Sequence, residues 1–458
     1  MTGTPTARAA RPQRGAELEL VVDSFAHGGN GIARHEGYVL FVQGGVPGDR
    51  LRARVTKAKR DYGEARATEL IEPSPDRIEP RAAHPGAAWQ VLPYERQLVE
   101  KERQVREALE RIGRFESPPV ESIVPAVEPW RYRNKVEYSF GASAEADGLV
   151  LGFHRAGRWN EIDDVGDDIL ASERVDGLRE RVKEWCRAEG LSPYDRRSND
   201  GFLRNLVVRE ARRAGTLQAR IVTSDGDFRA DDLAEAAGAD GFLWTRTASV
   251  AETTREGTTR VIAGAGAIEE RIDVLGDELR FRISPEAFFQ TNTEMAERLY
   301  GTAVELAGLT GSERVFDLFS GIGTIALAMA TRAGEVVGVE LVERAVADAI
   351  ENAKLNGIDN ARFFAGDVRT AMRPLVEEAG KPDVVVVDPP RAGLSAKIVR
   401  RLLETEARRV VYVSCNPTTL APNARQIADA GYTLRTVRPV DMFPQTPHIE
   451  CVAVLERD

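Results

Sequence analysis

Residues 314–330 read RVFDLFSGIGTIALAMA, and this stretch decides the fold class of the C-terminal part of the chain. An apolar run ends at Asp317-Leu318-Phe319, a turn with two glycines follows, and a second apolar run begins at Thr324. A strand that enters a helix through such a turn lets the backbone come close to a ligand. The stretch lacks the full G-x-G-x-x-G spacing, so taken alone it is compatible with any tight turn.

Short apolar strands alternate with amphipathic helices from about residue 276 onward. The expected strands are 314–319, 335–340, 361–366, 383–388, 408–414, 432–440 and 448–456. Near-continuous apolar strands separated by helices are typical of a largely parallel sheet covered on both faces, so we expect an α/β domain over residues 276–458. Ligands in such a sheet bind at the carboxyl ends of the strands.

Acidic residues stand at several of these strand ends. Glu340 follows the glycine turn by about 20 residues, where a carboxylate can hold the two hydroxyls of a ribose. A nicotinamide enzyme and a methyltransferase would both fit that pair of features. Asp367 and Asp388 end the next two strands, and Pro389-Pro390 stiffen the turn after Asp388 and hold its carboxylate in place.

Cys415 follows the apolar strand 408–414 and precedes Asn416-Pro417, so it stands at a carboxyl end beside Asp388. There we expect it to be partly exposed, unlike Cys186 and Cys451, which we assign to the core. A thiolate adds to carbon 6 of a pyrimidine and makes carbon 5 nucleophilic enough to take a methyl group. The proton on carbon 5 must then leave, and Glu450 in the last strand is the candidate general base.

Composition limits the class of protein. With 458 residues, of which 42% are hydrophobic, we expect two or three folded domains. The sequence shows neither a secretory signal nor an apolar run of roughly 18 residues, so we expect a cytoplasmic protein with no membrane segment. Three scattered cysteines indicate no disulfide framework and no structural metal site.

The net charge of −10 argues against a protein that coats nucleic acid indiscriminately. Two segments, 50–66 and 196–220, nevertheless each carry a local excess of five positive charges. They indicate a localised site for a polyanion, although solvated faces of surface strands and helices would give the same pattern.

The N-terminal half divides by pattern. Residues 1–14 have no apolar period and predict a disordered tail, whereas the short alternating runs of 15–73, broken by glycine clusters, predict a small β-barrel. Residues 74–275 mix strands and helices and predict an α+β middle domain. Within it, 94–114 predict a long amphipathic helix that we expect to pack on the catalytic domain.

Five motifs occur in order at compatible spacing. They are Phe288-Phe-Gln-Thr-Asn292, Asp317-Leu-Phe-Ser-Gly-Ile-Gly323, Asp388-Pro-Pro-Arg391, Ser414-Cys-Asn-Pro417 and Asp441-Met-Phe-Pro-Gln-Thr-Pro-His-Ile-Glu450. Together they resemble the RNA uracil-5-methyltransferase family. The resemblance extends over the chain, because 15–73 look like that family's TRAM domain and 131–135 like the entry to its middle domain.

The resemblance implies a Rossmann-like class I methyltransferase domain with an OB-like N-terminal barrel and an α+β middle domain. It implies RNA as partner, S-adenosyl-L-methionine as cofactor, Cys415 as nucleophile and Glu450 as base. The residues that it places in the cofactor pocket are Gln290, Phe319, Thr324, Glu340, Asp367 and Asp388. Asp388 is also a candidate to face the uracil, and Phe288 is either a stacking partner for an extruded base or a core residue.

The TRAM-like segment favours 23S ribosomal RNA as substrate, because the bacterial transfer-RNA branch of the family usually lacks it; transfer RNA is the alternative. Cytosine-5 methylation and a noncatalytic RNA assembly factor are further alternatives. We expect a monomer.

One departure from the family concerns a cofactor. The ribosomal branch often holds an iron–sulfur cluster on cysteines, but the matching stretches here, 83–90 and 164–168, contain none. Because such clusters are held by thiolates, we predict no iron–sulfur cluster.

Overall fold

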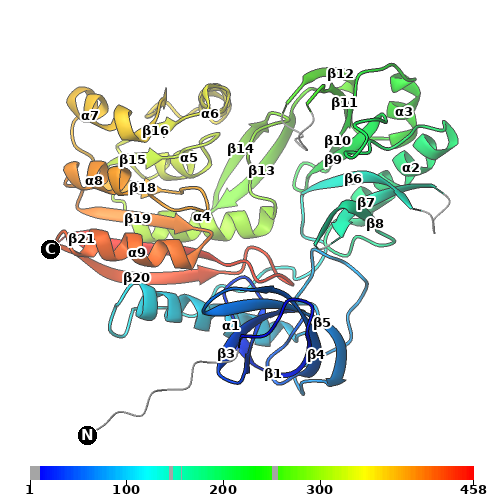
Figure 1. Ribbon diagram of the computed structural model, residues 1–458. Coiled ribbons are helices and arrows are strands. Elements are labelled where there is room, and N and C mark those ends of the chain that lie inside the picture. The colour runs from blue at the N-terminus through cyan, green and yellow to red at the C-terminus, as the bar shows by residue number, and fades with distance from the viewer. Residues whose placement is uncertain (1–10, 144–147, 156, 250–255, 458) are drawn as a thin grey trace, which may run out of the picture.

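The computed structural model describes residues 11–143, 148–155, 157–249 and 256–457. Figure 1 shows a barrel in blue, a middle α+β part mostly in blue-green and green, and an α/β part in light green to red. The expected combination of a Rossmann-like sheet, a small N-terminal barrel and an α+β middle part is therefore confirmed. Residues 1–10 of the expected disordered tail lie outside the described residues, whereas Arg11 already donates a hydrogen bond to the carbonyl of Ala58.

The N-terminal barrel closes in the strand order β1-β2-β3-β5-β4. Its strands are β1 (Glu17–Phe25), β2 (Gly31–His35), β3 (Tyr38–Gln43), β4 (Arg50–Ala58) and β5 (Tyr62–Glu72). Alternate residues such as Leu20, Val22 and Leu51 point inward and are buried, which is why the sequence alternates. The sequence pattern did not single out β2, because only two of its five residues, Ile32 and Ala33, are apolar.

A helix after the barrel, α1 (Tyr94–Glu107), continues into a π-helical turn, η1 (Ala108–Ile112). The expected helix is present and lies beside the red strands of the α/β part (Figure 1). Of its apolar positions, Val105 and Leu109 are buried as expected and Ile112 is exposed, while the polar side chains of Gln97 and Lys101 are buried as well. Hydropathy could not reveal this face, because its partners are polar groups far away in the sequence.

Those partners lie in residues 441–445, the loop that leads to Glu450. Asp441 is fully buried; it accepts hydrogen bonds from Lys101 Nζ on one oxygen and, at 2.8 Å, from the Tyr94 hydroxyl on the other. Two hydrogen bonds join Gln97 and Gln445. Gln97 Nε2 donates to Gln445 Oε1 at 2.8 Å, and the Gln445 backbone N–H donates to Gln97 Oε1 at 2.9 Å. Helix α1 therefore fixes the loop before Glu450 through buried polar contacts.

The middle part has a sheet of order β12-β11-β10-β9-β6-β7-β8 with two helices on one face. Its elements are β6 (Lys135–Ser143), β7 (Gly148–Arg155), β8 (Arg158–Asp164), α2 (Glu173–Ala188), β9 (Leu203–Ala211), β10 (Thr216–Thr223), α3 (Ala230–Ala237), β11 (Gly241–Arg246) and β12 (Thr258–Gly264). Tyr138, Phe140 and Leu206 face the helices, and the residues between them form the opposite, more polar face.

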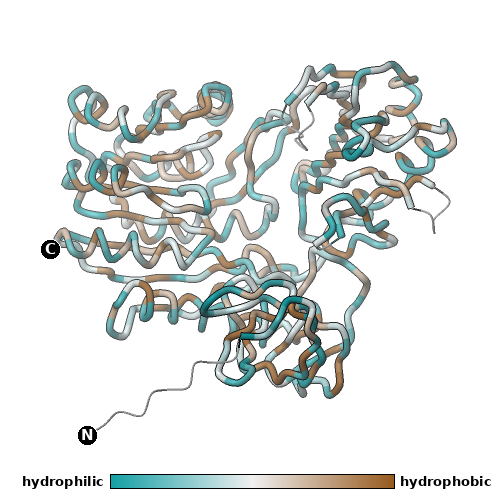
Figure 2. Tube along the Cα trace, viewed as in Figure 1, coloured by the Kyte–Doolittle hydropathy of each residue, from teal (hydrophilic) through white to brown (hydrophobic). Residues whose placement is uncertain are grey.

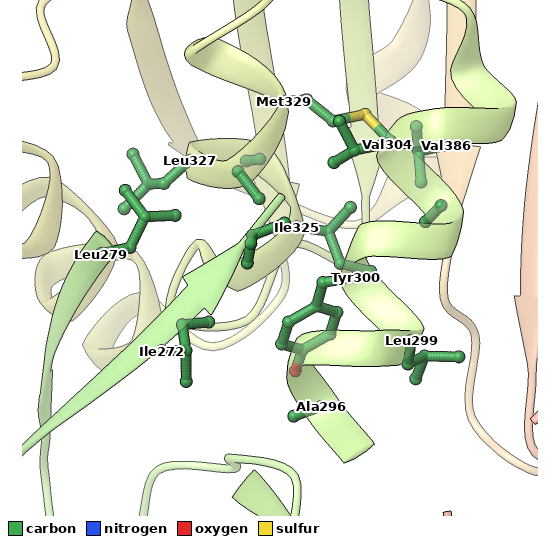
Figure 3. Packing of buried hydrophobic residues seen from close by; sticks show 14 of the residues in the cluster. Ile272, Leu279, Ala296, Leu299, Tyr300, Val304, Ile325, Leu327, Met329 and Val386 are labelled. Atoms are coloured by element: carbon green, nitrogen blue, oxygen red, sulfur yellow. The ribbon is translucent and has the colours of Figure 1, made fainter. Parts of the chain in front are cut away.

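A hairpin of β13 (Ile268–Val274) and β14 (Asp277–Ile283) crosses the expected domain boundary at 275/276. Figure 3 shows Ile272 and Leu279 of this hairpin packed with Leu299 and Tyr300 of the following helix and Ile325 of the next one. Since both strands contribute to the core of the α/β part, we propose that this domain begins at about residue 268 instead of 276.

The α/β sheet has the order β17-β16-β15-β18-β19-β21-β20. Its elements are α4 (Thr293–Ala307), β15 (Arg314–Leu318), α5 (Thr324–Ala330), β16 (Glu335–Glu340), α6 (Glu343–Leu355), β17 (Ala361–Ala365), α7 (Val368–Ala379), β18 (Val384–Val387), α8 (Ala396–Glu404), β19 (Arg409–Ser414), α9 (Pro417–Ala428), β20 (Tyr432–Val440) and β21 (Glu450–Arg457). Strands β15 to β19 are parallel, while β21 runs antiparallel between β19 and β20.

Hydropathy explains how this sheet is buried. In Figure 2 the helices around the sheet alternate between hydrophobic and hydrophilic residues along their length. Each helix therefore has an apolar side for the sheet, and the central strands, such as the four valines of β18, are buried on both faces. Within the described residues, no helix is long and apolar enough to cross a membrane.

We predict that Lys101→Met destabilises the protein by about 3–5 kcal/mol, because it leaves the buried Asp441 carboxylate without its cation. Denaturant unfolding followed by circular dichroism measures this change. Lys354→Met is the matched control, since Lys354 forms an exposed pair with Glu351 on α6, and the expected change is below about 1 kcal/mol. Equal effects of the two substitutions would show that Lys101 contributes no more than a surface lysine.

Candidate active site

Most of the candidate residues meet at the edge of the sheet formed by the carboxyl ends of β15 to β19. Phe319 follows β15, Glu340 ends β16, and Asp388 and Cys415 directly follow β18 and β19. The antiparallel strand β21 begins with Glu450 at this same edge. The parallel strands β15 to β19 and the antiparallel strand β21 therefore bring together residues as far apart in the sequence as Phe319 and Glu450, which are 131 positions apart.

The glycine turn after β15 has the shape that a closely approaching ligand requires. Phe319, Gly321 and Gly323 all have positive φ angles, of 76°, 55° and 87°. A Cβ atom at Gly321 would meet none of the described atoms within 4 Å, so the space above the turn is open. A Cβ at Gly323 would lie 3.1 Å from the Phe363 ring, so only glycine fits beneath it.

Glu340 is oriented by that turn. Its Oε2 accepts a hydrogen bond from the Gly321 N–H at 3.1 Å, and its Oε1 accepts one from the Val342 N–H at 2.9 Å. Because each carboxylate oxygen has two acceptor sites, Glu340 can still accept hydrogen bonds from two ligand hydroxyls. The next residues, Leu341 and Val342, are 67% and 56% exposed and present an apolar surface beside it.

Together these features fit the expected cofactor. An open glycine turn, a fixed carboxylate for ribose hydroxyls and exposed apolar side chains match the parts of an adenosine group. Thr324 begins α5 directly after the turn, and the Tyr300 hydroxyl of α4 hydrogen-bonds to it. Sequence reasoning missed Leu341 and Val342; apolar residues directly after a strand-end glutamate were the available signal.

Asp367 makes contacts within the protein at the start of α7. It is the N-cap of α7, where it accepts a hydrogen bond from the Arg369 N–H at 2.8 Å, and it also pairs with the Arg369 guanidinium. The hydrogen bond from Arg369 holds the pKa of Asp367 at about 2. A contact of Asp367 with the cofactor therefore remains a proposal. In this proposal the cofactor and Arg369 both bind the Asp367 carboxylate.

Gln290 comes from the loop before α4 and not from a strand end. Asn134, in the stretch 131–135, donates from Nδ2 to the Gln290 carbonyl at 2.8 Å, and Asn292 donates to the Met442 carbonyl at 3.0 Å. The motif around Gln290 is thereby bound both to the middle domain and to the loop before Glu450. Phe288, two residues earlier, is 62% exposed, so it is not a core residue.

Strand register places Cys415 beside Glu450. Ser414 of β19 pairs with Cys451 of β21, so the next residue toward the edge is Cys415 on one strand and Glu450 on the other. Asn416 begins α9 as its N-cap and donates from Nδ2 to the Arg391 carbonyl at 3.1 Å. The loop 388–391 and the loop that holds Cys415 are thus joined to each other.

Three acidic groups lie close together at this edge. Burial, followed by the charges of Glu450 and Asp388, raises the pKa of the Cys415 thiol to about 11. Burial and then Asp388 raise the pKa of Glu450 well above its ordinary value, and burial raises the pKa of Asp388 to about 7. The site therefore holds protons at neutral pH, because these groups cannot all be ionised together.

Two further charged residues were missed by the sequence analysis. Asp317 on β15 is buried, and burial and then the charge of Asp388 raise its pKa to about 8. Arg391 is exposed, and its positive charge acts against the raised pKa of Cys415 and of Glu450. Both residues belong to motifs that the sequence had already marked, at positions to which no role was given.

The loop between strands β1 and β2 of the barrel lies near this site. A Cβ at Gly29, in the loop between β1 and β2, would lie 2.7 Å from the Cβ of Pro447, so the Gly29 backbone packs directly against the Pro447 side chain. Partial desolvation and then the charge of Arg391 lower the pKa of His27 in that loop. Partial desolvation and then Arg391 also lower the pKa of His448, to about 4. The barrel loop therefore lies near the residues that surround Cys415.

The two stretches that match the family's cluster cysteines meet in the structure. Buried His84 lies 2.9 Å from Asp168 through Nε2 and Oδ1, and the Tyr138 hydroxyl donates to Asp168 Oδ2 at 2.7 Å. Although burial by itself would raise the pKa of Asp168, its hydrogen bonds and the charge of His84 lower it to about 2. A polar network thus fills this position, and Cys186, Cys415 and Cys451 lie elsewhere.

Comparisons with known proteins match nearly the whole chain. The model of the tRNA (Uracil-5-)-methyltransferase family matches residues 234–458, and that of the TRAM domain matches residues 11–68. An uncharacterized RNA methyltransferase of Halalkalibacterium halodurans is 39% identical over 96% of both chains, and one of Chlorobaculum tepidum is 39% identical over 98% of both. The resemblance expected from the motifs is confirmed.

A solved structure shares the architecture. The crystal structure of Pyrococcus abyssi tRNA (uracil-54, C5)-methyltransferase in complex with S-adenosyl-L-homocysteine is 29% identical, covers 96% of this chain and 100% of its own, and has a TM-score of 0.78. Because the alignment covers 96% of this chain, it must include most of the barrel, which spans residues 17–72. The likeness therefore includes the barrel, the middle part and the α/β domain together.

We predict that Cys415 reacts slowly with iodoacetamide at pH 8. A thiol with a pKa of 11 carries about 100-fold less thiolate at that pH than one with a pKa of 9, and the rate should rise about tenfold per pH unit up to pH 11. Glu450→Gln should speed the reaction because it removes one of the charges that raise this pKa, while Glu351→Gln on exposed α6 is the control. Mass spectrometry of the Cys415 peptide gives the rates. If Cys415 reacts at pH 8 as fast as an ordinary cysteine, its pKa is not raised and the prediction is wrong.

The absence of an iron–sulfur cluster stays a prediction. Within the described part of the chain, no three His, Cys, Asp or Glu side chains are arranged to hold a metal ion. We expect less than stoichiometric iron and no cluster absorption in the visible spectrum of anaerobically purified protein. One cluster's worth of iron per chain, with the matching spectrum, would contradict this prediction.

Proposed function

Because the chain belongs to the S-adenosylmethionine-dependent RNA uracil-5-methyltransferase family, we propose that it methylates carbon 5 of a uridine in RNA through a covalent adduct between Cys415 and the uracil. The observation that carries the proposal is the pairing of Ser414 with Cys451, which sets the thiol of Cys415 beside the carboxyl group of Glu450. A nucleophile and a base side by side at the ligand edge of the sheet are what this chemistry requires.

In the first step the Cys415 thiol gives its proton to the carboxylate of Asp388 or to water, and its sulfur bonds to carbon 6 of the uracil, which moves electron density to carbon 5. The positive charge of Arg391 favours the thiolate against the nearby carboxyl groups. Asp388, with a pKa near 7, can hold or release a proton at this edge under neutral conditions. Bound S-adenosylmethionine supplies an electrophilic methyl group for carbon 5.

In the last step Glu450 takes the proton from carbon 5. The electrons of that C–H bond form the double bond between carbons 5 and 6, and the bond from carbon 6 to the Cys415 sulfur breaks. Glu450 acts here in its ionised form, and because burial raises its pKa, this carboxylate binds the proton more tightly than an ordinary glutamate would. The proposal gives Phe288, exposed beside Gln290, the task of stacking on the extruded base.

For the RNA itself we propose 23S ribosomal RNA, on the ground that the chain carries a TRAM barrel. Transfer RNA is a second candidate with an observation in its favour: the aligned Pyrococcus abyssi structure, barrel included, is that of a tRNA (uracil-54, C5)-methyltransferase. The barrel is therefore compatible with both substrates. The proposal further takes the enzyme to act as a monomer in the cytoplasm.

We predict that the wild-type protein transfers a labelled methyl group from S-adenosylmethionine to RNA from a strain that lacks this protein. The labelled product is expected to be 5-methyluridine. Cys415→Ala should abolish this transfer because it removes the nucleophile, while Cys186→Ala in the middle-domain core should keep it. Glu450→Gln should accumulate a protein–RNA adduct that survives denaturing electrophoresis, because the carbon 5 proton cannot leave. Nucleoside analysis and gel electrophoresis give the two readouts.

The outcomes separate the alternatives. Label found in cytidine would mean that the enzyme methylates cytosine and not uracil. A protein that binds RNA without transferring methyl groups would favour the noncatalytic assembly factor. Absence of an adduct with Glu450→Gln would remove Glu450 from the role of base. Mapping the 5-methyluridine missing from the deletion strain decides between 23S ribosomal RNA and transfer RNA.

A further inference from the structure

A cavity of about 240 Å³ lies on the middle domain, on the face of its sheet opposite α2 and α3. Strands β6, β7, β8 and β9 form its floor, and the loop 193–197 forms its rim. The candidate residues of the active site are not among its lining residues. Part of the basic segment 196–220, which the active site leaves without a role, lies at this cavity.

The rim of the cavity is positively charged. Arg196, Arg197 and Arg204 line it, against Asp195 as the one carboxylate among its described lining residues. Asp195 accepts a hydrogen bond from the Arg197 backbone N–H at 2.8 Å, so it also stabilises the loop. Burial and then the charge of Arg204 lower the pKa of Arg196, as expected for two like charges that line one cavity. An anion bound between them would relieve this repulsion.

The cavity also offers flat and polar surfaces of fixed geometry. The Arg204 guanidinium lies 3.8 Å from the centre of the Tyr194 ring and donates to Ser224 Oγ at 3.0 Å and to the Ser249 carbonyl at 2.6 Å. On the floor, Asn205 Nδ2 donates to Ser139 Oγ at 3.1 Å, and Ser139 Oγ lies 3.2 Å from His154 Nε2. Aromatic rings and arginine planes are surfaces on which RNA bases stack.

The same face of the sheet leads toward the active site. Ser139 and Asn205 pair across β6 and β9 at the floor of the cavity, and on the same face Lys135 pairs with Arg209. The two pairs are four residues apart, about 13 Å at the rise of a strand. Arg209 donates to the carbonyl of Ala287, the neighbour of the exposed Phe288, at 2.9 Å. One strand face thus connects the cavity with the loop of Phe288.

We propose that this cavity binds one nucleotide of the substrate RNA outside the active site, with a phosphate at Arg196 and Arg197 and a base against Tyr194. Drug-sized ligands occupy pockets of roughly 300–1,000 Å³, so this smaller cavity suits a single nucleotide held in place by the rest of the RNA. The inference rests on the proposed function, because it takes the ligand to be the RNA that the enzyme methylates. A second contact of this kind fixes the register in which the target uridine enters the site.

The test is the double variant Arg196→Gln/Arg197→Gln, matched by Arg400→Gln/Arg408→Gln, which removes two exposed arginines of the α/β domain. The probes are unmodified 23S ribosomal RNA and transfer RNA transcripts. For the transcript that the wild type binds, we expect the cavity variant to raise Kd about tenfold and to lower the slope of log K against log salt by about 1–2. Its kcat at saturating RNA and its affinity for S-adenosylhomocysteine should stay within about twofold of the wild type.

Kd and salt slope equal to those of the control variant would overturn the inference. So would competition by uridine monophosphate at micromolar concentration, since the cavity would then be a site for free nucleotides. Arg197→Glu, on an exposed side chain, is the second variant if the double one does not fold, and it should weaken RNA binding more than Arg408→Glu. Binding is measured without the methyl donor, so a wild type that binds RNA but makes no 5-methyluridine refutes the proposed function and leaves the cavity test readable.

Discussion

The antiparallel insertion of β21 between β19 and β20 is the constraint on which the site depends. A parallel strand at that position would begin at the opposite edge and would carry Glu450 away from Cys415. With β21 reversed, the first residue of the last strand lies beside the residue that follows β19. The loop 441–449 must then turn the chain back at the ligand edge, and its position sets the position of Glu450.

That loop is held from outside the α/β domain. Lys101, Gln97 and Tyr94 of α1 bind it through buried polar groups, and Asn292 binds its backbone from the start of α4. Buried polar contacts of this kind are specific in direction, because each group loses its water and must find partners within the protein. The barrel, which precedes α1 in the chain, also touches this loop at Pro447. The barrel and Glu450 are thereby connected through one loop.

The same edge of the sheet concentrates acidic groups that would repel one another if all were ionised. Asp317, Asp388, Glu450 and Cys415 all have raised pKa values, with burial as the main cause, and Arg391 is the cation that acts against this trend at Cys415 and Glu450. Such a cluster stores protons and can exchange them as a substrate arrives, which matches a reaction that begins and ends with proton transfer. The middle domain contributes differently, with arginines beside a cavity on a polar sheet face.

The sequence by itself predicted the α/β fold with a largely parallel sheet, and it led to the proposal of Cys415 as nucleophile and Glu450 as base. These follow from local rules, because apolar strands alternate with helices and reactive residues follow the strands. The tertiary structure alone decided the polar face of α1, the hairpin of β13 and β14 across the expected boundary, the involvement of Asp367 with Arg369, and the meeting of His84 with Asp168. Several of these depend on partners far away in the chain, such as Lys101 with Asp441, and hydropathy or spacing along one segment carries no information about which distant group will satisfy a buried charge.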